Sequence, residues 1–109
     1  MKISEFKNKF NLKLLTDEGF SDREVTGCYI GDLLSHVMGK AASGNAWVTI
    51  MTNVNIVAVA SLVDAACILV CEGTDVSEDV LEKANEQDVI ILQSEKTAYE
   101  IAKAVAGVL

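Results

Sequence analysis

The feature that most constrains the fold is an unbroken run of seven apolar residues over 65–71. A strand with one face in water alternates apolar and polar residues, whereas an unbroken apolar strand is typical of the centre of a parallel sheet that is covered on both faces. Helical patterns flank this run, with Thr52-Asn53 as the cap of the helix before it and Ser77 as the cap of the helix after it. The run therefore predicts a parallel sheet with helical crossovers.

Helical and extended patterns alternate along most of the chain, and clusters of Gly, Asn, Asp and Ser separate them. From residue 25 onward the order is β-α-β-α-β-α-β-α. This order predicts an α/β fold: a single-domain layered sandwich with a mainly parallel sheet of four to five strands, helices on both faces and right-handed crossovers. The helix over 54–63 is apolar nearly all round, which predicts that it is buried. The expected elements, in order, are a helix over 4–9 with Ser4 as its cap, strands over 12–16 and 25–30, a helix capped by Asp32, a strand over 46–51, the helix over 54–63, the strand over 65–71, a helix capped by Ser77, a strand over 89–92 and a helix capped by Ser94.

The size and composition of the chain fit one domain. The sequence has 109 residues, of which 50% are apolar, and we place the domain over residues 1–109 with a short N-terminal helix in residues 1–10. A chain with no Pro and seven Gly is neither collagen-like nor a linker, and its apolar content excludes disorder. A domain of this length buries roughly 65% of its unfolded-chain surface, so it folds without disulfides or a structural metal.

The charges exclude several classes of partner. All of the net charge of −7 comes from residues 64–109, which hold ten acids and three bases. An acidic surface repels phosphate backbones and anionic lipids, and the chain has a single Arg, so we expect no nucleic acid and no membrane partner. Residues 41–63 carry no charge, but Ser, Thr and Asn interrupt them too often for a bilayer span. The mixed charges of residues 1–7 show no signal peptide, so we expect a cytoplasmic protein.

The three cysteines raise the question of a metal site. Cys67 and Cys71 are four residues apart on a predicted strand, which separates them by about 13 Å, and no CxxC spacing occurs. We therefore expect no metal or other cofactor, and we expect the thiols to be small buried apolar groups in a reducing compartment. The alternative is an iron–sulfur cluster that uses Cys28, Cys67 and Cys71 as ligands.

Polar residues follow the carboxyl ends of two predicted strands. Thr52 and Asn53 come after one strand, and Gly73 and Thr74 come after the next. In open α/β sheets ligands gather at this edge, so these residues are candidates for binding a small polar ligand, although the same residues also serve as ordinary helix caps. The segment over 26–32 has neither GxGxxG nor GxxxxGK[ST], which favours a structural turn over a phosphate-binding loop.

A catalytic constellation is not visible in the sequence. His36 is the single imidazole, it lies on the polar side of its predicted helix, and no nucleophile is positioned beside it by the pattern. We therefore expect a protein that is not an enzyme.

Residues 22–35, DREVTGCYIGDLLS, resemble the DRTGG domain family, which is named for residues of this segment. The matching positions are Asp22, Arg23, Thr26 and Gly27, and Cys28 stands where the family has a second glycine. The resemblance continues through residues 46–50, 55–60 and 66–70, and it covers roughly residues 10–105.

The resemblance implies a fold similar to the N-terminal domain of HPr kinase/phosphorylase and a regulatory, ligand-sensing and dimerising role without catalysis. It implies that Asp22, Arg23, Thr26 and Gly27 take part in binding a small polar ligand or a nucleotide. It also implies a homodimer, which agrees with the unusually apolar elements over 46–71, because a two-fold dimer buries apolar surface that one subunit leaves uncovered. The alternative is an accessory protein of an iron–sulfur or hydrogenase redox system, a label often given to stand-alone members.

Overall fold

The computed structural model describes residues 1–109 and confirms the layered α/β class. The chain forms five helices and five strands, which alternate from β2 onward. Each predicted element is present, with strands shorter than the sequence pattern suggests. The elements are α1 (Ile3–Lys9), β1 (Lys13–Leu14), β2 (Gly27–Ile30), α2 (Leu34–Lys40), β3 (Asn45–Thr49), α3 (Asn55–Val63), β4 (Cys67–Val70), α4 (Glu78–Glu86), β5 (Ile91–Gln93) and α5 (Ala98–Val105).

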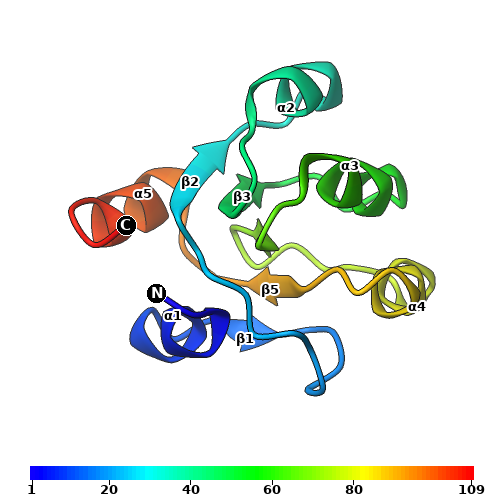
Figure 1. Ribbon diagram of the computed structural model, residues 1–109, viewed down its shortest axis with the longest axis horizontal. Coiled ribbons are helices and arrows are strands. Elements are labelled where there is room, and N and C mark those ends of the chain that lie inside the picture. The colour runs from blue at the N-terminus through cyan, green and yellow to red at the C-terminus, as the bar shows by residue number, and fades with distance from the viewer.

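The strands form one sheet in the order β1-β5-β4-β3-β2. Strands β2, β3, β4 and β5 are parallel, and β1 pairs antiparallel with β5. Since the parallel strands follow one another in sequence order, all three crossover helices lie on the same face of the sheet. Figure 1 shows this layer of α2, α3 and α4 on one side of the sheet, with α1 and α5 on the other.

Strand β4 separates two apolar cores, and each of its residues is buried. Cys67 and Leu69 point into the core formed with α1 and α5, and Ile68 and Val70 point into the core formed with α2, α3 and α4. This alternation confirms that the apolar run is a central strand covered on both faces.

Three predicted helix caps are wrong because the side chain bonds elsewhere. Asp32 does not cap α2, whose N-cap is Leu33; its Oδ1 accepts from the Thr49 hydroxyl at 2.7 Å and from the Ile50 N–H at 2.9 Å. The carboxylate therefore joins the ends of β2 and β3 instead of starting a helix.

The caps of α5 and α1 differ from the prediction for the same reason. Thr97 is the N-cap of α5, with its Oγ1 accepting from the Glu100 N–H at 3.2 Å, while Ser94 accepts from the Lys96 N–H at 3.1 Å inside the preceding turn. The Ser4 hydroxyl donates to Asp22 Oδ2 at 2.6 Å and so does not cap its own helix.

Helix α3 is not buried all round, contrary to the expectation from its apolar composition. Ile56, Val57 and Ala60 are buried, but Val54 is 50% exposed and Leu62 is 71% exposed. One apolar side of α3 therefore faces solvent.

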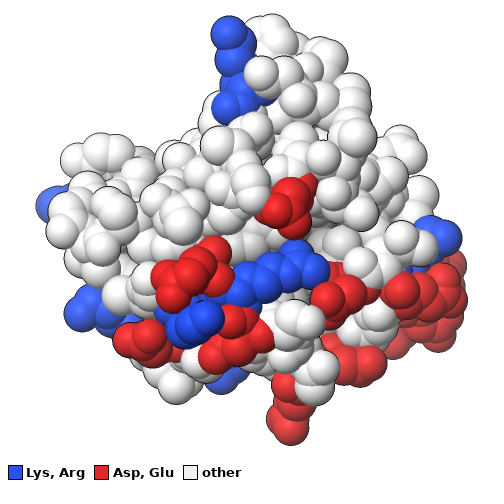
Figure 2. Space-filling view, viewed as in Figure 1, with Lys and Arg blue, Asp and Glu red and all other residues white.

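The surface is divided by charge. Figure 2 shows acidic side chains gathered over α4, mixed charges over the segments in front of α1 and β1, and a wide uncharged region between α4 and α2. None of the five helices is both long enough and apolar enough to cross a membrane.

Candidate functional site

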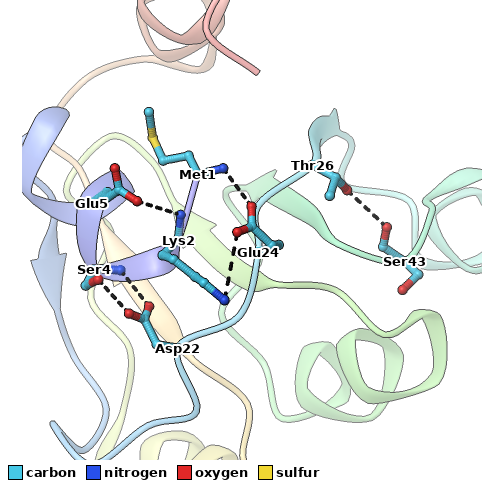
Figure 3. Close-up of polar contacts among 8 residues, drawn as sticks. All are labelled: Met1, Lys2, Ser4, Glu5, Asp22, Glu24, Thr26 and Ser43. Atoms are coloured by element: carbon cyan, nitrogen blue, oxygen red, sulfur yellow. Dashed lines mark hydrogen bonds and ion pairs between the residues drawn. The ribbon is translucent and has the colours of Figure 1, made fainter.

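The segment over 22–27 lies at the edge of the sheet where the parallel strands begin, and its first acid holds α1 in place. Asp22 Oδ1 accepts from the Ser4 N–H at 2.9 Å, and Asp22 Oδ2 accepts from the Ser4 hydroxyl (Figure 3). The Ser4 N–H belongs to the first turn of α1 and has no acceptor within the helix. Asp22 therefore caps α1 from 18 residues away, and these hydrogen bonds from Ser4 hold the pKa of Asp22 below its usual value.

Glu24 binds the residues at the start of the chain. Its Oε2 lies 2.7 Å from the Met1 ammonium and its Oε1 lies 3.8 Å from Lys2 Nζ, as Figure 3 shows. The hydrogen bond from the Met1 ammonium is the largest cause of the lowered pKa of Glu24. Backbone hydrogen bonds run in both directions beside this pair, from the Ile3 N–H to the Arg23 carbonyl at 2.9 Å and from the Val25 N–H to the Met1 carbonyl at 2.7 Å.

Arg23 joins two loops that precede neighbouring strands. Its Nη1 donates to the Ala65 carbonyl at 3.1 Å, just before β4, and its Nη2 donates to the Asp88 carbonyl at 2.7 Å, before β5. Nη2 also lies 3.1 Å from Asp88 Oδ2. Carbonyls that follow the end of a helix have no N–H partner within the helix. Here the planar guanidinium of Arg23 donates hydrogen bonds to two such carbonyls, those of Ala65 and Asp88. Both terminal nitrogens of Arg23 are thus committed to the protein itself.

Thr26 lies beside a cavity that Arg23 and Glu24 also line. The Thr26 N–H donates to the Gly44 carbonyl at 2.9 Å, and its hydroxyl donates to the Ser43 carbonyl at 3.3 Å. Gly44 has a φ of +84°, and a Cβ there would collide with the Thr26 hydroxyl. We call the adjacent cavity of about 350 Å³ the motif cavity; it is lined by Arg23, Glu24, Thr26, Ser43, Gly44, Asp64 and Ala66.

Gly27 and Cys28 open β2 and differ in how much space they have. A Cβ on Gly27 would come within 2.9 Å of Asn45 Nδ2, so this glycine leaves room for the Asn45 side chain. Cys28 is half-buried and packs against the core on the α1 side. The backbone at position 28 therefore accommodates a side chain where the family name has glycine.

The remaining predicted site residues lie at the opposite edge of the sheet. Thr52 and Asn53 follow β3, and Gly73 and Thr74 follow β4. The four residues of β4 separate the two edges by about 13 Å, so the structure does not bring this set together with the motif residues.

Several polar groups at that second edge form hydrogen bonds with other residues of the chain. The Gly73 N–H donates to the Ser94 carbonyl at 2.8 Å, and the Thr74 carbonyl accepts from Gln93 Nε2 at 2.9 Å. The N-cap of α3 is Val54 and not the predicted Thr52-Asn53, although Asn53 Oδ1 accepts from the Asn55 N–H at 2.9 Å at the start of the helix. The bonds of Gly73 and Thr74 join the loops that follow β4 and β5, at the point where the next helices turn to opposite faces of the sheet.

The three thiols do not share a site with other ligating groups. No group of three or more His, Cys, Asp and Glu side chains lies close enough to hold a metal ion. Burial raises the pKa of Cys28 and Cys71 and raises the pKa of Cys67 to about 12, which keeps all three thiols protonated near neutral pH. The iron–sulfur alternative remains a prediction from the sequence.

Comparison with protein families identifies the fold and the motif together. The model of the DRTGG domain matches residues 7–108, which is nearly the whole chain. The chain belongs to the DRTGG domain family. The resemblance inferred from Asp22, Arg23, Thr26 and Gly27 is thereby confirmed, whereas the similarity to HPr kinase/phosphorylase stays a prediction.

A solved structure has the same fold as this DRTGG domain. It contains the CBS and DRTGG domains of the regulatory region of a Clostridium perfringens pyrophosphatase, in complex with the activator diadenosine tetraphosphate. The TM-score is 0.73 at 9% sequence identity, and the alignment covers 98% of this chain and 46% of that one. This chain therefore spans about half the length of its structural neighbour, and the likeness shows the fold alone. None of the curated proteins matches the sequence.

Five residues around the motif cavity of this DRTGG domain were not among the predicted site residues: Glu24, Ser43, Gly44, Asp64 and Ala66. Ser43 donates to Asp64 Oδ2 at 2.6 Å, so two loops meet there. A usable signal existed, because Ser43-Gly44 and Asp64 precede predicted parallel strands just as Thr26 does. Residues in that position share one edge of a parallel sheet.

Proposed function

We propose that this chain is a non-catalytic regulatory domain that senses a small polar ligand of the nucleotide class and associates with a second copy of itself. The observation that carries the proposal is the family match over residues 7–108, together with a fold shared with the regulatory region of a pyrophosphatase that was solved with a nucleotide activator. A domain of this family that senses a ligand needs a pocket and a means of transmitting occupancy.

The reactive side chains support a role without catalysis. His36 is exposed on α2, and the Cys71 thiol donates to the Thr49 carbonyl at 3.6 Å while burial raises its pKa. A nucleophilic site needs a base within hydrogen-bond reach of the nucleophile. The structure offers no such pair around its single imidazole.

The motif cavity is our candidate for the ligand site. Glu24 is 54% exposed, and its two carboxylate oxygens can accept further hydrogen bonds beside their contacts with Met1 and Lys2. The hydroxyls of Thr26 and Ser43 lie at the same cavity. Carboxylates accept hydrogen bonds from hydroxyl and amino groups, and they repel phosphate. Because the guanidinium of Arg23 is already bonded, the cavity suits the ribose and base of a nucleotide better than its phosphates.

Thermal unfolding with added compounds tests the ligand and its site. The panel is adenosine, AMP, ATP, diadenosine tetraphosphate and inorganic phosphate, each titrated over a wide range. A ligand at a hundredfold excess over its Kd stabilises the native state by about 2.7 kcal/mol. We expect stabilisation by adenosine and the nucleotides and none by phosphate; stabilisation by none of them would overturn the ligand-sensing role.

A pair of variants then locates the site. Glu24→Gln keeps the shape of the side chain but removes its charge, and we expect it to weaken nucleoside binding at least tenfold. Glu18→Gln, in the exposed loop between β1 and β2, is the matched control. If both variants bind the nucleoside with the same Kd, the ligand does not bind in the motif cavity.

A further inference from the structure

We infer that two copies of this chain associate through the outer face of α2 and α3, with each α3 lying in the groove between α3 and α4 of the other copy. This inference rests on the proposed self-association and adds the surface and the symmetry. We call the surface the α2–α3 face and define it by Leu33, Met38, Val54, Ala58 and Leu62.

The exposed apolar side chains are concentrated on this part of the molecule. Eight large apolar residues are exposed in the whole chain, and two of them, Tyr99 and Val108, belong to the α5 side. The other six lie on α2, on α3 or on the strand ends that lead into them. They are Ile30 (46%), Leu33 (58%), Met38 (45%), Ile50 (44%), Val54 (50%) and Leu62 (71%). Exposed apolar side chains that gather in one part of a charged protein point to an interaction site there.

The shape of the α2–α3 face fits a second copy. Val54, Ala58 and Leu62 recur every four residues, so they form a ridge along one side of α3. A groove of about 560 Å³ runs beside this ridge; it is lined by Val54, Asn55, Val57, Ala58, Ser61, Leu62, Lys83 and Gln87. Helices pack by placing the ridges of one into the grooves of another. A ridge and a groove side by side on one surface complement each other when the surface meets its own copy.

The arrangement of ridge and groove selects the symmetry axis. A two-fold axis parallel to the helices reverses the order of α2, α3 and α4 in the facing copy. The ridge of each copy then enters the groove of the other. A two-fold axis that runs across the helices sets ridge against ridge and α4 against α4. The first arrangement is therefore the one that buries both features.

The charges select the same axis. Helix α4 carries Glu78, Asp79, Glu82 and Glu86 against a single Lys83, whereas α2 carries His36 and Lys40 and no acid. Figure 2 shows the acidic side chains over α4 and a basic side chain over the end of α2. An axis along the helices brings α4 of one copy toward α2 of the other, and the uncharged α3 lies between them. An axis across the helices instead opposes two acidic α4 helices, which costs energy because like charges repel.

Sedimentation equilibrium over a series of protein concentrations tests the α2–α3 face. We expect the wild-type chain to dimerise and Leu62→Glu to raise the dimer Kd at least a hundredfold, since the two-fold symmetry introduces the charge twice. Tyr99→Glu is the matched control: Tyr99 is 74% exposed and lies on α5, so its dimer Kd should stay within threefold of the wild type. Because Leu62 is 71% exposed, Leu62→Glu should keep the wild-type circular dichroism and thermal midpoint.

A charge reversal tests the symmetry. At low ionic strength we expect Lys40→Glu to raise the dimer Kd roughly three- to tenfold, Lys103→Glu on α5 to leave it unchanged, and the double variant Lys40→Glu/Glu82→Lys to restore most of the loss. Failure of the second charge to rescue the first would overturn the axis along the helices.

The outcomes separate this inference from the proposed function. A wild-type dimer that Leu62→Glu leaves intact would mean self-association through another surface, which overturns the inference and leaves the proposed function standing. A wild-type chain that stays monomeric at millimolar concentration would overturn the inference and, with it, the self-association in the proposed function, while the ligand titrations would still test ligand sensing.

Discussion

The assignment of Arg23 to the fold, and not to a ligand, makes a quantitative prediction for Arg23→Ala. The substitution removes the donor of the Ala65 carbonyl, and Ala65 is 3% exposed, so a buried acceptor loses its partner at a cost of about 1–3 kcal/mol. The Asp88 carbonyl and carboxylate are in an exposed residue and water replaces the guanidinium there, so the lost ion pair adds only about 0.2–1 kcal/mol. The sum is about 1–4 kcal/mol of unfolding free energy.

Urea unfolding followed by circular dichroism measures this loss. Arg23→Lys provides a graded comparison, because an ammonium reaches one carbonyl where the planar guanidinium reaches two, and it should recover less than half of the loss. Lys103→Ala removes an exposed cation of α5 and should change the free energy by less than about 0.5 kcal/mol. The structural role would be refuted if Arg23→Ala were as stable as the wild type but failed to bind a nucleotide that the wild type binds. Arg23 would then be a ligand-binding residue.

Three further predictions follow from single contacts. Asp22→Asn should destabilise the chain near neutral pH by weakening the cap of α1. Because the folded-state pKa of Asp22 is lowered from 3.8, this difference from the wild type should shrink as the pH falls through that lowered pKa, and urea titrations at several pH values between about 7 and 2 will show it. Gly44→Ala should cost about 1–3 kcal/mol because of its φ of +84° and its contact with Thr26, whereas Gly39→Ala, in open space on α2, should stabilise by about 0.5–1 kcal/mol; thermal unfolding compares the two. Cys67, with its pKa raised to about 12 and no exposed surface, should resist iodoacetamide in the native protein and react after unfolding, as mass spectrometry will count.

The class of fold was predictable because its signals are local. The unbroken apolar run of β4 identifies a central strand, and the polar clusters between runs mark where elements end. The predicted helix caps were wrong where the side chain forms a hydrogen bond with a residue that is distant in the sequence. Asp32 satisfies the rule for a helix cap, yet its carboxylate binds Thr49 and Ile50 on the neighbouring strand. Sequence spacing carries no information about which of two sets of hydrogen-bond donors a carboxylate binds when both are within reach.

The candidate site was predictable only in part, for a topological reason. Asp22 to Gly27 precede β2, and Thr52, Asn53, Gly73 and Thr74 follow β3 and β4, so a parallel sheet must place the two sets at opposite edges. The sequence therefore contained enough information to separate them once the strands were called parallel. The packing of Ser43 and Asp64 beside Thr26 could not be predicted from the sequence, because it depends on how two helix-to-strand turns meet.

Helix α3 connects the two proposals physically. Its C-cap is Asp64, which accepts a hydrogen bond from Ser43 at the motif cavity, and its outer side carries Val54, Ala58 and Leu62 of the α2–α3 face. A ligand that changes the position of Asp64 therefore acts on the same rigid element that forms the ridge between two copies. Linkage is reciprocal: a ligand that binds the dimer more tightly than the monomer must strengthen the dimer by the corresponding factor. For that reason the dimer Kd measured with and without nucleotide, in the wild type and in Glu24→Gln, reports directly on whether occupancy of the motif cavity is transmitted through α3.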